Sequence, residues 1–277
     1  MSQREPPRES LEEMLEITAR GADCYGATLE SFWGQATSGD LLARATLAAG
    51  RRRGEPPTAL QAVFIGELPP GVELAIEVEG LGRGLDRVRV LHGGSAVAEL
   101  NARFGPPGGG LAYQTATSDS GLPTPEELPS EVEVARAEGW EPYAVGPIES
   151  RRVTPYEPVE DHEPAEWIGW LHPRAPIPAD PCIQAAAIAF LAEYRSHWAV
   201  ERRLGKEFPN SQITLLDHGL WIHRVTPWDG WWKVTTHSDV AASGRCLSRR
   251  TIHARDGQLV ASAAWQSHVR PLSGAVA

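Results

Sequence analysis

The chain has 277 residues, of which 42% are hydrophobic and 22% are charged, as in folded globular proteins rather than disordered ones. This length suffices for one large domain or two smaller ones, and we favour two. The formal net charge of -10 argues against a nucleic-acid partner, because phosphate binding draws on a clustered basic surface.

The cysteines and the apolar segments give no sign of export or membrane insertion. Cys24, Cys182 and Cys246 are far apart and fit neither a disulfide framework nor a zinc pattern. The polar N-terminus lacks the apolar core of a signal peptide, and no run of about 18 apolar residues occurs. We therefore expect a cytoplasmic protein with no membrane span. The chain also lacks a phosphate-binding loop, a dinucleotide fingerprint and a nucleophile elbow, so we expect no cofactor.

The first half predicts helices followed by a meander of strands. Ser10-Leu11-Glu12-Glu13 resembles a capping box and predicts a short helix over 10–19. Apolar residues at helical spacing predict a buried helix over 34–50, which Gly50 would end. Glycine and proline turn signals then separate four predicted strands, at 59–68, 72–81, 85–92 and 96–104.

The second half repeats this order after a connection. Residues 105–164 are rich in glycine, proline and acidic residues, which is typical of an interdomain connection with one or two short elements. Asp180 as N-cap and Pro181 at the first position predict a helix over 180–198. Four strands are predicted to follow it, at 212–225, 230–242, 245–254 and 258–269.

Two turns carry the clearest trace of an internal repeat. His92-Gly93-Gly94 and Arg255-Asp256-Gly257 each lead into a strand with Val-Ala at the same offset. Two copies of a helix and a curved antiparallel sheet make an α+β fold. We expect the copies to pair edge to edge in one continuous sheet. Exposed edges of such a sheet are commonly closed by association, so a homodimer or higher homo-oligomer is expected.

The most informative motif is Leu216-Asp217-His218-Gly219-Leu220-Trp221-Ile222-His223-Arg224. Together with Trp231, the turn at 242–245 and the stretch 256–262, it resembles the C-terminal half of the type II, double hot-dog acyl-CoA thioesterases. Phe32-Trp33-Gly34-Gln35 and the Pro70-Gly71 turn extend the resemblance, more weakly, to the first half. The resemblance implies two tandem repeats of a long helix wrapped by a curved antiparallel sheet. The expected parts are an N-terminal hot-dog domain (1–110), a connecting segment (111–164) and a C-terminal hot-dog domain carrying the active site (165–277).

In that family an Asp, a Thr or Ser, and a Gln hold the water that attacks the thioester. Asp217 matches the family Asp. The hydroxyl position falls at Ser238 to Asp239, with Asp239 as the closer match. Trp265 stands where the family has Gln, and Gln266 follows one residue later. A one-residue slip turns a strand side chain to the opposite face, so Gln266 fills the role only if a bulge restores its direction.

The residues themselves also single out Asp217. Strand alternation places it on one face with Gly219, Trp221 and His223. Apolar and aromatic neighbours would desolvate the carboxylate and suit it to proton transfer, although an Asp that caps a turn or pairs with Arg is the competing interpretation. Asp239 is either a second acid that shares a proton with Asp217 or a surface residue at a strand end.

We assign Trp221, His223 and Trp265 to substrate binding, although most of the ten tryptophans are expected to fill the core. Trp265, as a bulky ring in place of Gln, would shorten or block the site. The histidines are scattered, with no pair at ligand spacing and no accompanying carboxylates. We therefore expect no metal site.

The leading hypothesis is an acyl-CoA thioesterase of fatty acid metabolism that releases free acid and CoA. Asp217 would be the general base, aided by Asp239 or Ser238 and by Gln266, with an amide at the N-terminus of a buried helix polarising the carbonyl. The alternative is a protein that binds acyl thioesters without hydrolysing them, or a dehydratase or isomerase acting on them. An Asp–His dehydratase pair is disfavoured, because Asp217 and His223 are six strand residues apart, about 20 Å. The sequence leaves open which acyl group is bound and whether the thioester is one of CoA or of a carrier protein.

Overall fold

The structure is a computed structural model that describes residues 10–29, 31–32, 35–36, 38–66, 71–105, 108, 111–115, 121–137, 139, 146–155, 157–160 and 163–272. Trp33, Gly34 and Pro70, which belong to the weaker first-half resemblance, lie outside these residues. The described helices are too short or too polar to span a bilayer.

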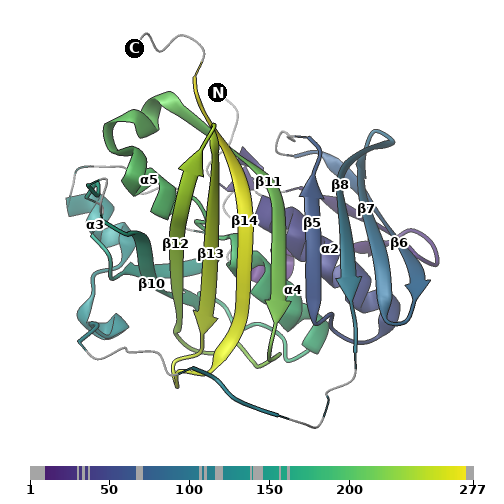
Figure 1. The fold of residues 1–277 in the computed structure, drawn as a ribbon. Coiled ribbons are helices and arrows are strands. Elements are labelled where there is room, and N and C mark those ends of the chain that lie inside the picture. The colour runs from purple at the N-terminus through teal and green to yellow at the C-terminus, as the bar shows by residue number, and fades with distance from the viewer. Residues whose placement is uncertain are drawn as a thin grey trace.

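One antiparallel sheet runs through both halves of the molecule (Figure 1). Its strand order is β1-β2-β6-β7-β8-β5-β11-β14-β13-β12-β10-β9. The two halves join where β5 pairs with β11, with Leu220 opposite Leu60. The predicted edge-to-edge pairing of two copies in a continuous sheet is therefore confirmed.

The predicted helices and long strands are present with shifted ends. The first half contains α1 (Leu11–Met14), α2 (Ser38–Arg53), β5 (Ala59–Phe64), β6 (Glu73–Gly82), β7 (Leu85–His92) and β8 (Ser95–Arg103). The second half contains α4 (Pro181–Glu193), β11 (Ser211–Ile222), β12 (Trp232–Ala242), β13 (Arg245–His253) and β14 (Leu259–Pro271). The helix predicted over 180–198 stops early because Arg195 adopts a left-handed φ of 57°, and α5 (Trp198–Leu204) follows.

Several short elements were not predicted. Strand β2 (Cys24–Thr28) pairs with β6, and β10 (Ala165–Pro173) lies between β12 and β9 (Ile148–Arg152). The other short elements are β1 (Thr18–Ala19), β3 (Ser31–Phe32), β4 (Gln35–Ala36), α3 (Glu131–Ala137) and the 3-10 turns Pro125–Glu127 and Gly205–Asn210. Strands β1 and β2 extend the large sheet at one edge and β10 and β9 at the other, beyond the eight strands that the sequence predicts, whereas β3 and β4 pair in a separate two-stranded sheet.

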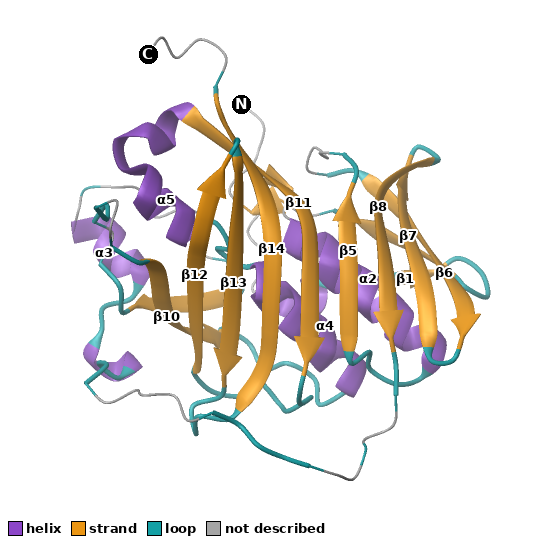
Figure 2. Cartoon of the chain, in the orientation of Figure 1, coloured by secondary structure: helices purple, strands orange, loops and turns teal. Residues whose placement is uncertain are grey.

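The two long helices lie against each other on one side of the sheet, and in Figure 2 they lie behind it. They run in opposite directions, because Gly39 at the start of α2 approaches Glu193 at the end of α4, and Gly50 approaches Cys182. A Cβ on Gly39 would lie 2.9 Å from the Glu193 Oε2 atom. Glycine at these positions therefore permits the close helix contact. We call the sheet face that packs on these helices the inner face, and the opposite one the outer face.

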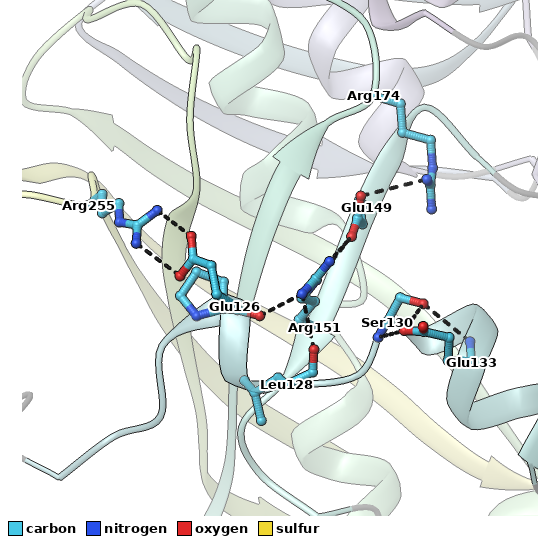
Figure 3. A network of polar contacts seen from close by, with 9 residues as sticks. Glu126, Leu128, Ser130, Glu133, Glu149, Arg151, Arg174 and Arg255 are labelled. Carbon is cyan, nitrogen blue, oxygen red and sulfur yellow. Dashed lines mark hydrogen bonds and ion pairs between the residues drawn. The ribbon is translucent and has the colours of Figure 1, made fainter.

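The described part of the connecting segment is attached to the second half, as Figure 3 shows. Arg255, in the turn between β13 and β14, pairs with both carboxylate oxygens of Glu126 at 2.7 and 2.9 Å. Arg151 of β9 donates to the carbonyls of Pro125 and Leu128. These described residues therefore form part of the second repeat's surface, whereas the domain limits at 110 and 164 stay a prediction.

Candidate functional site

The site predicted around Asp217 is built on a β-bulge. Register along β11 shifts between Leu215, which is opposite Ser267, and Asp217, which is opposite Gln266. Leu216 is the extra residue, so Asp217 turns to the same face as Gln266 instead of following Leu215 to the inner face. The bulge that the sequence interpretation required for Gln266 is thus present, on the neighbouring strand.

Asp217 and Gln266 contact each other across β11 and β14. The Gln266 backbone N–H donates to the Asp217 Oδ1 atom at 3.1 Å. Asp217 is exposed and Gln266 is half-buried. The expected desolvation of Asp217 by apolar neighbours is therefore wrong, because the carboxylate is exposed on the outer face, which none of the described helices covers.

Trp265 lies on the other side of the sheet. It is 1% exposed and stacks on His218, with ring centroids 5.6 Å apart. Since neighbouring residues of a strand point to opposite faces, Trp265 and Gln266 cannot line the same face. The structure places Trp265 in the packed layer between sheet and helices, away from the face that carries Asp217.

Asp239 also occupies a bulge, between Ser238 and Val240 of β12. Its carboxylate pairs with Arg249 at 2.7 Å. β14 and β13 separate β12 from β11, so Asp239 is about 14 Å across the sheet from Asp217 at the usual strand spacing. The two carboxylates therefore do not contact each other, and of the two interpretations of Asp239 the structure agrees with a surface residue, paired with Arg249.

Ser238 is not brought to Asp217 either. It is opposite Ser248 of β13, which is opposite Trp265 of β14, which in turn is opposite His218 of β11. Residues directly opposite each other share a face, so Ser238 belongs to the inner face. The hydroxyl position of the expected catalytic set is therefore separated from Asp217 by the sheet itself.

Trp221 and His223 lie farther along the chain from Asp217. Trp221 is 43% exposed, and its ring covers Gly219, where an added Cβ would lie 3.0 Å from the ring. His223 follows β11 and its Nε2 atom lies 2.9 Å from the Ser262 hydroxyl. Burial and the neighbouring Arg224 lower the pKa of His223. Trp221 thus shares the outer face of β11 with Asp217, whereas His223 contacts the start of β14.

A second polar cluster, not predicted from the sequence, lies on the inner face at the end of α4. Arg250 is 2% exposed and donates to the carbonyls of Leu191 and Tyr194 at 2.8 and 2.7 Å and to the Thr236 hydroxyl at 2.8 Å. Burial lowers its pKa to about 9, so the guanidinium stays charged at neutral pH. The cluster holds the C-terminal carbonyls of α4 against the sheet.

His218 belongs to the same cluster and is 1% exposed. Burial, with a smaller contribution from Arg250, lowers its pKa to about 4. The Ala192 carbonyl opposes this shift, and among the described residues neither ring nitrogen has a partner with full hydrogen-bond geometry. The alternation that places Asp217 outward is the sequence signal that assigns His218 to the core.

His218 should make the fold sensitive to acid. The His218 imidazole has a pKa of about 4 in the folded chain and 6.5 in the unfolded chain. The free energy of unfolding should therefore fall as pH falls from 6.5 to about 4, because the unfolded chain takes up this proton more readily. The full loss is about 3 kcal/mol. Urea unfolding of wild type and His218→Phe at pH 7 and pH 4.5 measures it. An equal loss of stability in both proteins would show that His218 is not responsible.

Carboxyl side chains lie at the N-termini of both long helices, where the sequence interpretation placed the amide that polarises the carbonyl. The first amides of α4, those of Cys182 and Ile183, donate to the Asp180 side chain. The first turn of α2, at Gly39, faces the buried Glu193 carboxylate. Among the described residues, no group of three or more His, Cys, Asp or Glu side chains is arranged to hold a metal ion.

The chain matches one family model, described as the acyl-CoA thioesterase C-terminal domain, over residues 125–268. It is 27% identical over 109 residues to the acyl-CoA thioesterase 2 of Haemophilus influenzae, an alignment that covers 39% of this chain and 38% of that protein. The chain thus matches well under half the length of this curated relative.

Solved structures with little sequence identity share the fold. An acyl-CoA thioesterase II from Mycobacterium marinum superimposes with a TM-score of 0.78 at 21% identity, over 95% of this chain and 99% of that one. A hot-dog protein from Alicyclobacillus acidocaldarius gives 0.73 at 14% identity, over 94% and 97%. With the twelve-stranded sheet and the two long helices packed on it, they confirm the α+β double hot-dog fold.

Proposed function

Because the chain belongs to the family of the acyl-CoA thioesterase C-terminal domain, we propose that it hydrolyses an acyl-CoA thioester to the free acid and CoA. The observation that carries the proposal is the pairing of Asp217 with Gln266 on one face of β11 and β14. A carboxylate next to an amide side chain is the arrangement needed to hold and deprotonate a water molecule.

In the proposed mechanism, Asp217 is the general base. The Gln266 N–H fixes its Oδ1 atom, which leaves the Oδ2 atom to accept a proton from water. The Gln266 side chain orients that water, which attacks the thioester carbonyl. The tetrahedral intermediate then collapses to the free acid and expels the CoA thiolate, which takes up the proton that Asp217 removed from water. Asp239 and Ser238 have no part in this mechanism, because two strands lie between Asp239 and Asp217 and because Ser238 lies on the inner face.

Trp221 is the residue that we propose for substrate contact, because its exposed ring lies over Gly219, on the face of β11 that carries Asp217. His223 would meet a more distant part of the substrate. Trp265 is not proposed to contact the substrate, because it is buried against His218 on the inner face. We further propose that the protein acts in the cytoplasm, in fatty acid metabolism.

The second candidate is an acyl-thioester-binding protein without hydrolytic activity, or an enzyme that performs a different reaction on the thioester. Two observations favour it. The position at which Gln was expected carries the buried Trp265, and Asp239 is engaged by Arg249. The catalytic set would then be reduced to Asp217 and Gln266.

Thiol release from acyl-CoAs of increasing chain length separates these candidates. A thioesterase should release CoA from at least one substrate in proportion to enzyme concentration. Acyl-CoA binding detected by calorimetry without CoA release would contradict hydrolysis and support the second candidate. The same assay with acyl-carrier-protein thioesters, made in parallel with the CoA series, determines which carrier the enzyme uses.

A further inference from the structure

Two buried side chains that the proposed mechanism does not use lie directly behind Asp217 and Gln266. His218 follows Asp217 in β11, and Trp265 precedes Gln266 in β14. The strand register places His218 opposite Trp265 and Asp217 opposite Gln266, as consecutive pairs of one ladder. We call His218 and Trp265 the inner pair, and Asp217 and Gln266 the outer pair. Because the two pairs share the same backbone segments, a contact that fixes the inner pair also fixes the strand positions of the outer pair.

The outer pair lies next to an interruption in the ladder. Leu216, the extra residue of the bulge, directly precedes Asp217. An extra residue disrupts strand pairing locally, so the outer pair continues into regular pairing only on the side of the inner pair. The outer pair itself is joined by the hydrogen bond from the Gln266 N–H to the Asp217 Oδ1 atom, on a face open to water. Such an exposed bond contributes little to fixing the register.

The inner pair, by contrast, is buried and stacked. His218 and Trp265 are each 1% exposed, and their rings lie within 3° of parallel with centroids 5.6 Å apart. The Arg250 guanidinium lies 5.4 Å from the centroid of the Trp265 ring and donates to the carbonyls of Leu191 and Tyr194 at the end of α4. In Figure 1, α4 lies behind the strands that carry this pair. The stack therefore connects β11 and β14 to each other and to the helix behind them.

We propose that His218 and Trp265 are positioning residues, whose stack fixes the register of β11 on β14 beside the bulge and so holds the Asp217 carboxylate at the Gln266 N–H. This role rests on the proposed function, in which the outer pair binds and deprotonates water. A general base must lie within hydrogen-bond reach of the proton that it takes, and a displacement of about 1 Å can lower the rate about 100-fold. Neither residue contacts the substrate, and both act through the backbone of their neighbours.

A role in core packing alone makes a different prediction, and His218 separates the two. Packing alone should affect the free energy of unfolding and leave the chemistry of the folded protein unchanged. The ring nitrogens of His218 have no partner with full hydrogen-bond geometry among the described residues. Leucine at this position would remove these buried, unsatisfied atoms and should leave the fold no less stable. It would also remove the stack on Trp265, so a loss of rate without a loss of stability indicates positioning.

The experiment compares His218→Leu with His218→Phe. Both substitutions remove the ring nitrogens, but only Phe keeps an aromatic ring against Trp265. His218→Leu should lower kcat for CoA release about 10- to 100-fold, with KM within about threefold of wild type because the substrate contacts are unchanged. His218→Phe should retain kcat within about threefold of wild type, because the stack is kept. Urea unfolding at pH 7 and circular dichroism verify that each variant is folded.

Hydrogen exchange of the Gln266 N–H, followed by NMR, tests the position of the outer pair without relying on activity. Asp217→Ala removes the acceptor of this N–H and gives the exchange rate of the broken hydrogen bond. His218→Leu should raise the exchange rate toward that value, by about 3- to 10-fold, the worth of one hydrogen bond. His218→Phe should exchange as wild type does.

Trp265→Leu repeats the test from the other strand, with Trp228→Leu as the matched control. Trp228 is also 1% exposed and stacks on Trp232, with ring centroids 5.3 Å apart. Its N–H donates to the Gln184 side chain near the start of α4, whereas the inner pair lies at the end of this helix. Both substitutions should reduce stability by loss of buried aromatic area. Only Trp265→Leu should also lower kcat and speed exchange at Gln266.

Wild-type kcat and wild-type Gln266 exchange in folded His218→Leu and Trp265→Leu would overturn the positioning role. Equal losses of kcat in His218→Leu and His218→Phe, or in Trp265→Leu and Trp228→Leu, would overturn it as well. A wild type that releases no CoA from any substrate contradicts the proposed function instead. The exchange measurement then still decides whether the inner pair fixes the outer one, so failure of one proposal is distinguishable from failure of the other.

Discussion

Replacement of Asp217 by Asn is expected to lower kcat for acyl-CoA hydrolysis by about 10²- to 10⁴-fold, the usual contribution of a general base. Asn keeps the size of the side chain and an oxygen that can accept the Gln266 N–H, but it cannot take a proton from water. Because Asp217 is exposed, the change should leave the free energy of unfolding close to that of wild type. Thiol release at saturating substrate measures the effect.

Asp239→Asn is the matched control for this prediction. Asp239 lies in the other bulge and pairs with the exposed Arg249, three strand spacings from Asp217. Hydrolysis by Asp239→Asn should stay within about twofold of wild type, because a surface ion pair contributes little. Equal losses in the two variants would show that the carboxylates act together, and an active Asp217→Asn protein would exclude Asp217 as the base.

Replacement of Arg250 by Met is expected to reduce the free energy of unfolding by about 3 kcal/mol, because removal of a buried charged donor leaves buried carbonyl acceptors unsatisfied. Met retains an apolar stem beside Trp265 but leaves the carbonyls of Leu191 and Tyr194 without their donor. Those carbonyls end α4, so the helix terminus should lose its attachment to the sheet. Urea unfolding at pH 7 measures the change.

The adjacent residue supplies the control. Arg249 points to the outer face, with its side chain 60% exposed, and pairs with Asp239. Arg249→Met should therefore change the free energy of unfolding by less than about 1 kcal/mol. Similar losses for Arg249→Met and Arg250→Met would contradict a structural role specific to the buried guanidinium.

The predicted long strands agree closely with the structure, because each is bounded by a turn whose chemistry is local. Gly93 and Gly94 have φ values of 56° and 83°, and Gly257 has 84°. Residues other than glycine rarely adopt this backbone region, so the sequence alone locates such turns. The end of α4 was missed, because a left-handed Arg195 has no local signal and is held by packing.

The composition of the site was only partly predictable. Strand alternation separates His218 from Asp217 correctly, but it also implies that Gln266 and Asp217 need a bulge to meet. No residue type identifies the extra residue as Leu216, since a bulge is set by how β11 pairs with both β14 and β5. The expected partnership of Asp217 with Asp239 failed because sequence distance says nothing about the two strands inserted between them.

By itself, the sequence determined that the chain holds two helix-and-sheet repeats and that Asp217 lies on a long strand of the second. These features depend on residue periodicity and turn chemistry, which act over a few neighbouring residues. Only the tertiary structure decided that Asp217 and Gln266 share the outer face, that Trp265 belongs to the core, and that Asp239 pairs with Arg249. These outcomes depend on strand register between segments far apart in the chain, where a shift of one residue reverses the face of every side chain.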